Sequence, residues 1–198
     1  MGKDRATTEA KLIQAVGEII ARDGFEGLGI RKIAEKANVN KTLIYRYFNS
    51  MNGLIVAYLK ANDFWTSPKS TNFNGKNARE HLRNFYRQEV SMLRANVALR
   101  KLRCWELTTE NELVDEIRER REENGRRFME EMSSYAATEK DNIQAVATLL
   151  DAGIVNLALC ADKFQFYNGI DIQSNKGWEQ ILRGIDTLID VLVESKDE

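Results

Sequence analysis

The sequence predicts an all-α fold, in which a small N-terminal three-helix domain precedes a larger helical body. Apolar residues recur at helical spacing through most of the chain, and its 198 residues include one proline, Pro68. The composition is 43% hydrophobic and 30% charged, which supplies a core without the bias of a disordered chain. We expect the N-terminal domain over residues 1–50 and the larger helical domain over residues 51–198.

The first expected helix follows Thr7 or Thr8, either of which can cap its N-terminus. Apolar residues between positions 12 and 20 fall on one face of this helix, and Gly24 is suited to end it. A short second helix is expected over residues 30–37 and a third over residues 41–48.

The turn between the second and third helices has the sequence Asn38-Val39-Asn40. Asn38 tolerates left-handed backbone geometry, and Asn40 is a good N-cap for the third helix. A fourth helix is expected from Met51 to about Trp65.

The rest of the chain alternates long helices with short breaks. Residues 66–77 are rich in Ser, Thr, Asn and Gly and predict a linker, and residues 162–176 predict a loop with a turn at Asn168-Gly169. The remaining helices are expected at 78–95, 97–109, 111–136, 140–161 and 177–195.

Several function classes lack support in the sequence. The chain shows no signal peptide and no apolar run of membrane-spanning length, so a cytoplasmic protein with no membrane partner is expected. Cys104 and Cys160 predict buried, reduced thiols. With His81 as its single histidine the chain has no metal-ligand spacing. No catalytic constellation and no cofactor motif appears, so we expect neither an enzyme nor a bound cofactor.

Positive charge is concentrated in one segment. The whole chain has a net charge of −1, but residues 27–60 contain six lysines and arginines against one acid, Glu35. A basic segment on an acidic body suits phosphate binding at one end. The alternative is a solvated helix pair whose charge balance has no function.

Residues 30–48 have the pattern of a helix-turn-helix. Their apolar positions are spaced to pack the two short helices together, with Ala34 and Ala37 small where helices cross closely. The polar positions are left to face outward, where a short helix can enter the major groove of DNA.

This stretch resembles the DNA-binding head of the TetR family of repressors, over about residues 7–60. The resemblance is carried by Ile33-Ala34, Ala37-x-Val39 and Ile44-Tyr45-x-Tyr47-Phe48-x-Ser50. It implies a homodimer that binds palindromic double-stranded operator DNA. The implied DNA-binding residues are Arg31, Asn40, Lys41, Thr42, Leu43, Tyr45, Arg46 and Tyr47.

Four positions depart from the family pattern. Asn38 replaces a usual turn glycine, Gly29 replaces a helix cap, Leu43 replaces a small polar residue and Met51 replaces a lysine. Leu43 is expected to make an apolar contact, such as one to a thymine methyl group. Alternative interpretations remain for the other positions: the two tyrosines could form a core stripe, and Lys41 and Arg46 could be solvated surface charges.

The resemblance also implies an effector pocket in the body. The aromatic and methionine content suggests a small, mainly apolar or aromatic effector. The expected pocket residues are Tyr58, Trp65, His81, Phe85, Arg103, Trp105, Phe128 and Met132. The alternative is that these side chains are ordinary core residues.

The last two helices are apolar around most of their circumference, and such helices must be buried on two sides. Gly153 and Gly184 permit close helix approach. We therefore expect them to form half of an intersubunit four-helix bundle. The expected interface residues are Leu150, Ile154, Leu157, Ile181, Ile185, Leu188 and Leu192.

Taken as a whole, the sequence favours a transcriptional repressor that an effector releases from its operator. A second hypothesis is a helical ligand-binding or scaffold dimer with a vestigial DNA-binding head. The basic segment favours the first, because a vestigial head has no need to retain it.

Overall fold

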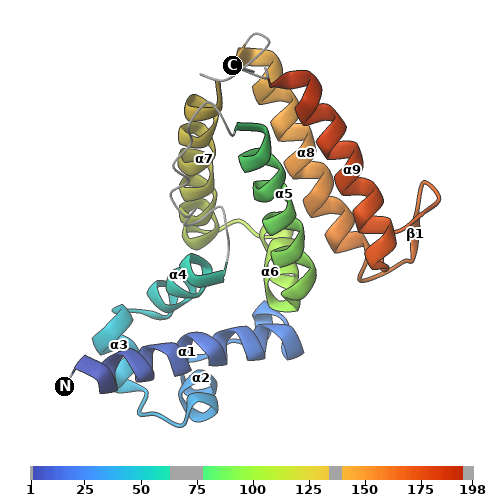
Figure 1. Cartoon of the computed structure of the whole chain (residues 1–198). Coiled ribbons are helices and arrows are strands. Elements are labelled where there is room, and N and C mark those ends of the chain that lie inside the picture. The colour runs from blue at the N-terminus through green and yellow to red at the C-terminus, as the bar shows by residue number, and fades with distance from the viewer. Residues whose placement is uncertain (1, 63–77, 134–139, 194–198) are drawn as a thin grey trace. The chain divides into compact units, whose positions relative to one another are not determined.

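The chain is an assembly of helices with one small hairpin, as the computed structural model shows for residues 2–62, 78–133 and 140–193 (Figure 1). The all-α prediction is confirmed. The N-terminal elements are α1 (Gly2–Asp23), a 3₁₀ turn η1 (Phe25–Gly27), α2 (Ile30–Ala37), α3 (Thr42–Phe48) and α4 (Met51–Asn62). The remaining helices are α5 (Ala78–Ala95), α6 (Val97–Thr108), α7 (Glu112–Ser133), α8 (Lys140–Cys160) and α9 (Asn175–Leu192).

The helix boundaries agree with the sequence predictions to within a few residues, except at the N-terminus. There α1 begins at Gly2, so the predicted cap at Thr7 or Thr8 is wrong. The hydroxyl of Thr8 instead donates to the carbonyl oxygen of Asp4, inside the helix. The predicted linker at residues 66–77 lies outside the described residues.

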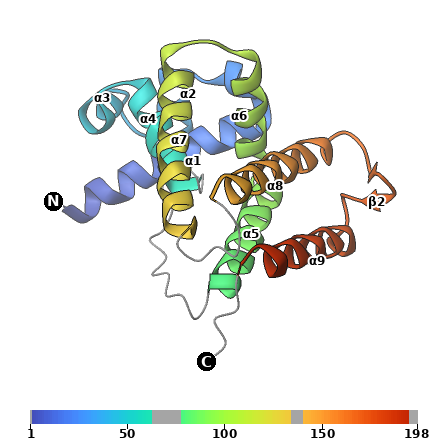
Figure 2. The same cartoon turned by 90° about the horizontal axis from the view of Figure 1, so that it is seen from above.

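The loop predicted at residues 162–176 contains an antiparallel hairpin, with β1 (Phe166–Tyr167) paired to β2 (Ile170–Asp171). Its turn is the predicted Asn168-Gly169 pair, and both residues have positive φ, 48° and 80°. The hairpin connects the ends of α8 and α9 (Figure 2). The indole Nε1 of the buried Trp178 donates to the carbonyl oxygen of Ile172 at 2.7 Å, which ties the hairpin base to α9.

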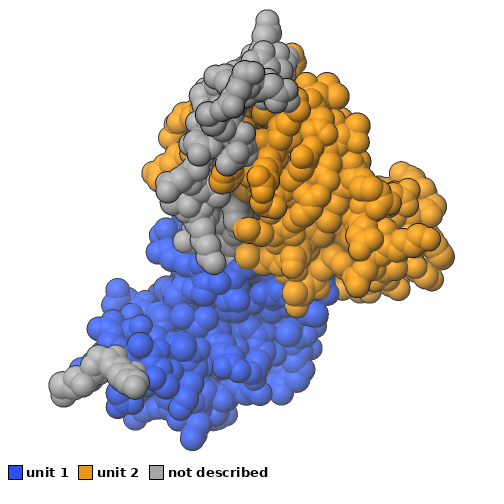
Figure 3. Space-filling view, in the orientation of Figure 1, with its two compact units in different colours: residues 1–68, 96–121 blue, residues 69–95, 122–198 orange. Residues whose placement is uncertain are grey.

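The chain divides into two compact units (Figure 3). Unit 1 contains residues 1–68 and 96–121, and unit 2 contains residues 69–95 and 122–198. Unit 1 thus joins α6 and the start of α7 to the N-terminal helices. The separation into residues 1–50 and 51–198 stays a prediction about functional domains.

In unit 1, α6 packs along α1. The ammonium of Lys101 donates to the carbonyl oxygen of Ala21 at 2.7 Å, near the C-terminal end of α1. A cation at this end of a helix satisfies a free carbonyl and interacts favourably with the helix dipole. The rings of Phe25 and Trp105 stack with their centroids 3.5 Å apart. These contacts anchor α6 to the same core that holds the short helices.

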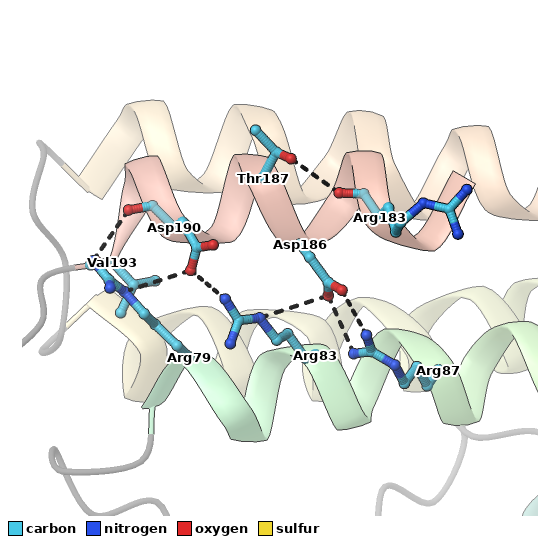
Figure 4. Close-up of polar contacts among 8 residues, drawn as sticks. All are labelled: Arg79, Arg83, Arg87, Arg183, Asp186, Thr187, Asp190 and Val193. Atoms are coloured by element: carbon cyan, nitrogen blue, oxygen red, sulfur yellow. Dashed lines mark hydrogen bonds and ion pairs between the residues drawn. The ribbon is translucent and has the colours of Figure 1, made fainter. Parts of the chain in front are cut away.

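In unit 2, α5 packs against α8 and α9. Phe85 on α5 stacks on Phe128 of α7, with ring centroids 4.4 Å apart. Arginines also line the α5–α9 contact: Arg79, Arg83 and Arg87 reach toward Asp186, Asp190 and the end of α9 (Figure 4). We call these three arginines the arginine ladder.

The exposure of the cysteines and of one apolar helix differs from what the sequence predicts. Cys104 is exposed, so the prediction that both thiols are buried is wrong for this residue, and Cys160 is half-buried. By length and composition alone, the segment Asn142–Cys160 could cross a membrane: its mean hydropathy is 1.7, and 17% of it is buried in the described structure.

Candidate nucleic-acid interface

The two short helices pack as a helix-turn-helix. Ile33, Ala34 and Ala37 of α2 and Ile44 of α3 are buried, as their spacing predicts. α2 packs on α1, and α3 packs on α4, which also contacts α1. Because this core takes up the inward faces, the polar positions of α2 and α3 are directed to the surface.

The turn between α2 and α3 has the geometry that the sequence predicts. Asn38 adopts the left-handed conformation, with φ 53° and ψ 49°. The side-chain oxygen of Asn40 accepts from the backbone N–H and the hydroxyl of Thr42, both at 2.9 Å. Asn40 therefore satisfies a free amide at the start of α3, but the N-cap residue is Lys41, one position later than predicted.

A second tight junction follows α3. Asn49 has a φ of 64°, and the hydroxyl oxygen of Ser50 accepts from the N–H of Gly53 at 3.0 Å to cap α4. A Cβ atom at Gly53 would lie 2.0 Å from the carbonyl oxygen of Phe48. The chain can turn this closely from α3 into α4 only because residue 53 is glycine.

The residues expected to bind DNA lie mostly at the surface. The side chain of Tyr45 is 52% exposed, which excludes a core role for it. Tyr47 and Leu43 are half-buried, so the core-stripe alternative still applies to Tyr47. The other exposed members of the set are Arg31, Asn40, Lys41, Thr42 and Arg46. An open groove of about 580 Å³ runs over this surface and is lined by Arg31, Ala34, Glu35, Asn38, Val39, Asn40 and Lys41.

Two of the six cations counted in residues 27–60 are paired with acids of α1. Lys32 contacts Asp23 at 2.6 Å, and Lys36 contacts Glu18 at 2.8 Å. Hydrogen bonds from Arg22 and Lys32 hold the pKa of Asp23 well below its usual range. A hydrogen bond from Lys36 lowers the pKa of Glu18. These ion pairs join α2 to α1. Fewer than the six lysines and arginines of residues 27–60 are therefore available to bind a phosphate.

Sequence analysis missed one cation beside α3. The guanidinium carbon of Arg5, on α1, lies 5.2 Å from the ring centroid of Tyr47. Its Nε donates to the carboxylate of Glu9 at 2.7 Å. The i,i+4 spacing of Arg5 and Glu9 was the available signal for the ion pair, but no local pattern indicates the contact with Tyr47.

The residues expected to line an effector pocket are distributed over both units. In unit 1, Tyr58 is buried with its hydroxyl donating to Asn96 at 3.3 Å, Trp105 stacks on Phe25, and Arg103 is half-buried. His81, Phe85 and Phe128 belong to unit 2. Trp65 and the side chain of Met132 lie outside the described residues.

Unit 2 holds a small apolar cavity of about 30 Å³. Of the expected pocket residues that the structure describes, Phe128 is the one that lines this cavity. The other lining residues are Leu82, Tyr86, Met129, Ile143, Val146, Ala147, Leu150, Ile189, Leu192 and Val193. Burial raises the pKa of Tyr86, and the negative charges of Glu89 and Asp151 raise it further, so this hydroxyl stays protonated.

The residues expected at a dimer interface also divide into two groups. Ile154 and Ile185 are 2% and 4% exposed, so they are already buried within one protomer. Leu188 is 43% exposed, and Leu150, Leu157, Ile181 and Leu192 are half-buried. The two most exposed large apolar residues of these helices, Leu149 at 71% and Val191 at 72%, were not among those predicted.

Across the described ranges, no group of three or more His, Cys, Asp or Glu side chains is placed to hold a metal ion. The exposed side chains of α2, α3 and the turn between them include cations, hydroxyls and an amide, which suit phosphate and base-edge contacts.

A family comparison matches residues 12–58 to bacterial regulatory proteins of the tetR family. Over residues 12–58 the chain is similar to the TetR family. The match spans α1 to α4, the segment that carries the helix-turn-helix described above. Among curated proteins, none matches the chain.

Solved structures of regulators share the fold over nearly the whole chain. The fatty acid degradation regulator FadR from Bacillus halodurans is 17% identical with a TM-score of 0.62, covering 92% of this chain and 94% of its own. A putative TetR-family regulator from Rhodococcus sp. is 20% identical with a TM-score of 0.60, covering 93% and 100%. FadR from Bacillus subtilis, solved with stearoyl-CoA, is 18% identical with a TM-score of 0.60, covering 95% and 99%.

Proposed function

We propose that this protein is a transcriptional repressor that binds palindromic operator DNA as a homodimer. The observation that carries the proposal is the surface of α3 and the preceding turn. Lys41, Thr42, Tyr45 and Arg46 are exposed there, while Ile44 anchors the helix in the core. A helix of seven residues with one fully buried side chain gains little from packing alone, and its exposed side suits the major groove.

The test begins with the selection of tight-binding duplexes from a randomised library by the full-length protein. We expect a palindromic site with half-sites at least one helical turn apart, about 34–36 Å. On that site Lys41→Ala should cost about 1–3 kcal/mol if Lys41 reads a base, and it should cost less on random DNA. Tyr45→Phe should weaken both kinds of DNA alike, because phosphate contacts position the protein without reading sequence.

Lys36→Ala is the matched control, since Lys36 is paired with Glu18 and lies outside the proposed contact set. Equal losses on operator and random DNA for Lys41→Ala would remove Lys41 from base readout. Failure of the wild-type protein to select any duplex would favour the scaffold alternative, in which the head is vestigial.

The proposed dimer rests on the uncovered apolar surface of α8 and α9. α8 combines a mean hydropathy of 1.7 with 17% burial, and Leu149, Leu188 and Val191 face solvent in the isolated protomer. A Cβ atom at Gly153 or Gly184 would meet nothing within 4 Å, so both helices have room for a close neighbour. A second copy covers such a surface through a self-complementary two-fold interface.

Sedimentation at micromolar concentration tests this interface. We expect a wild-type dimer, and we expect Leu188→Asp and Val191→Asp to give folded monomers, because each places a charge in the interface but not in the protomer core. Ile185→Asp would instead unfold the protomer, since Ile185 is buried within it. A monomeric wild-type protein would contradict the dimer, and its flotation with lipid vesicles would assign α8 to a membrane.

We propose further that a small, mainly apolar or aromatic effector releases the DNA. The apolar cavity supports an apolar ligand, but its 30 Å³ holds about one water molecule. An effector must therefore displace lining side chains such as Phe128 and Met129. The fold shared with a regulator that was solved with stearoyl-CoA is compatible with an apolar chain.

A constitutive DNA binder is the second candidate, and the small cavity favours it. The two are separated by melting the protein with a panel of fatty acids, acyl-CoA thioesters and aromatic acids. An effector should raise the melting temperature and release the selected duplex, and Phe128→Ala should change the affinity for it. If no compound does either, constitutive binding stands.

A further inference from the structure

The guanidinium of Arg5 is held beside the recognition helix, although Arg5 is 42 positions away from Tyr47 along the chain. It lies over the Tyr47 ring at 5.2 Å from the centroid, and Glu9 binds its Nε at 2.7 Å. The Arg5 side chain remains 61% exposed. Its orientation is therefore restrained on one side while its outer face is open to solvent.

We propose that Arg5 is a DNA backbone contact: its guanidinium binds an operator phosphate next to the one approached by Tyr47. The protein–DNA interface then extends from α2 and α3 onto the first turns of α1. This inference rests on the proposed DNA-binding function and adds a residue that neither the sequence pattern nor the family match assigns, because the match begins at residue 12.

The chemistry of the arrangement suits a phosphate. Arginine carries five N–H donors in a fixed plane, and the pair with Glu9 uses the one at Nε. The two terminal NH₂ groups are left for phosphate oxygens, which arginine binds with charge-assisted hydrogen bonds. The stacking on Tyr47 restricts the side chain before DNA arrives, so less conformational freedom is lost on binding.

Neighbouring charges set the balance. Glu9 and the exposed Asp4 are acids of the same helical turns and repel a phosphate. The Arg5–Glu9 pair is exposed with i,i+4 spacing, and pairs of this kind are weak. The charge of Glu9 therefore opposes phosphate binding by Arg5 only weakly. Removing the charge of Glu9 should strengthen DNA binding. If the pair were only structural, the same change would lower the stability of the folded protein instead.

The experiment measures the affinity of full-length protein for a random-sequence duplex by fluorescence anisotropy, from 50 to 200 mM KCl. A random duplex suffices because phosphate contacts do not depend on sequence. Each phosphate contact contributes about 0.9 to the slope of log affinity against log salt. For each DNA-binding head that is bound, Arg5→Ala should reduce the magnitude of that slope by about 0.9. Glu9→Gln should raise the affinity at 50 mM KCl.

Two further variants separate the role of the charge from structural effects. Arg5→Lys keeps the charge and should preserve the slope while weakening binding, because lysine lacks the planar fork. Arg22→Ala removes an arginine at the opposite end of α1, where Arg22 is bound to Asp23, and should leave the slope unchanged. Thermal melts of all four variants confirm that they are folded.

An unchanged slope for Arg5→Ala, in a wild-type protein that binds DNA, would overturn the role of Arg5 and leave the proposed function standing. A wild-type protein that binds no duplex at any salt concentration would overturn both. A loss of slope in Arg22→Ala equal to that in Arg5→Ala would reduce the effect to net charge and also overturn the contact.

Discussion

Arg79, at the start of α5, closes the C-terminal end of α9 by binding the carbonyl oxygen of Val193. Its Nε and one terminal nitrogen donate to that oxygen at 3.0 and 2.8 Å, and the same terminal nitrogen reaches the carbonyl oxygen of Asp190 at 3.1 Å (Figure 4). The last carbonyls of a helix have no partner within it. Arg79 binds one of them, that of Asp190, together with the carbonyl of the C-cap residue Val193, and it places a cation at the negative end of the helix dipole.

Arg79→Ala should therefore destabilise the protein by about 1–2 kcal/mol, near the lower range for hydrogen bonds from charged groups because the side chain is partly exposed. Urea unfolding followed by circular dichroism measures the change. Arg126→Ala is the control, since Arg126 forms an exposed i,i+4 pair with Glu130 and should cost less than about 0.5 kcal/mol. Equal effects of the two substitutions would mean that the Arg79 cap contributes nothing.

The arginine ladder should couple α5 to α9 only modestly. Arg87 binds both carboxylate oxygens of Asp186, at 3.1 and 2.5 Å, in a bidentate pair at the surface. A double-mutant cycle of Arg87→Ala and Asp186→Ala should give a coupling energy of about 0.2–1 kcal/mol that shrinks in high salt. A coupling that is indifferent to 1 M salt would show that packing, and not charge, joins these residues.

Gly53→Ala should destabilise the DNA-binding head, although alanine is the better helix former. The new Cβ would lie 2.0 Å from the carbonyl oxygen of Phe48, so the junction of α3 and α4 must shift. We expect a loss of about 1–3 kcal/mol in thermal unfolding. Gly29→Ala is the control: a Cβ there meets nothing within 4 Å, so only the cost of alanine at the N-cap of α2 is expected, less than about 1 kcal/mol. If Gly53→Ala matched this control, the close approach would be absent in solution.

The head should lose stability in acid through Asp23. Hydrogen bonds from Arg22 and Lys32 lower the pKa of this carboxyl in the folded protein. A lowered folded pKa adds stability above the unfolded value, about 4, and that stability is lost as pH falls toward the folded pKa. The melting temperature should therefore fall below about pH 4, and less steeply in Asp23→Asn. Parallel curves for the two proteins would assign the acid sensitivity to other groups.

The helix-turn-helix could be predicted because its determinants are local. Asn38 and Asn40 set the turn and the cap through their own side chains and backbone, and Ile33 and Ile44 follow helical spacing. The ion pairs Lys32–Asp23 and Lys36–Glu18 could not be predicted from local sequence, because they depend on how α2 crosses α1. The same holds for Arg5 and Tyr47.

The C-terminal helices show a different limit. Periodicity indicates that α9 is apolar on more than one side, but it does not tell which side packs within the protomer. Ile185 is buried there, while Val191 is open to solvent. The hairpin was missed because its strands are two residues long and depend on non-local contacts, such as that from Trp178 to Ile172.

The turn of that hairpin also determines where the purified protein should deamidate during storage. Asn168 and Gly169 are exposed, and glycine leaves the following backbone nitrogen unshielded beside the asparagine amide. Attack of that nitrogen on the amide carbonyl releases ammonia and forms a cyclic imide, which opens to aspartate or isoaspartate. Asparagine is among the thermolabile residues for this reason. Each event adds a negative charge at the hairpin tip, so stored samples should acquire a more acidic species whose altered peptide contains residue 168.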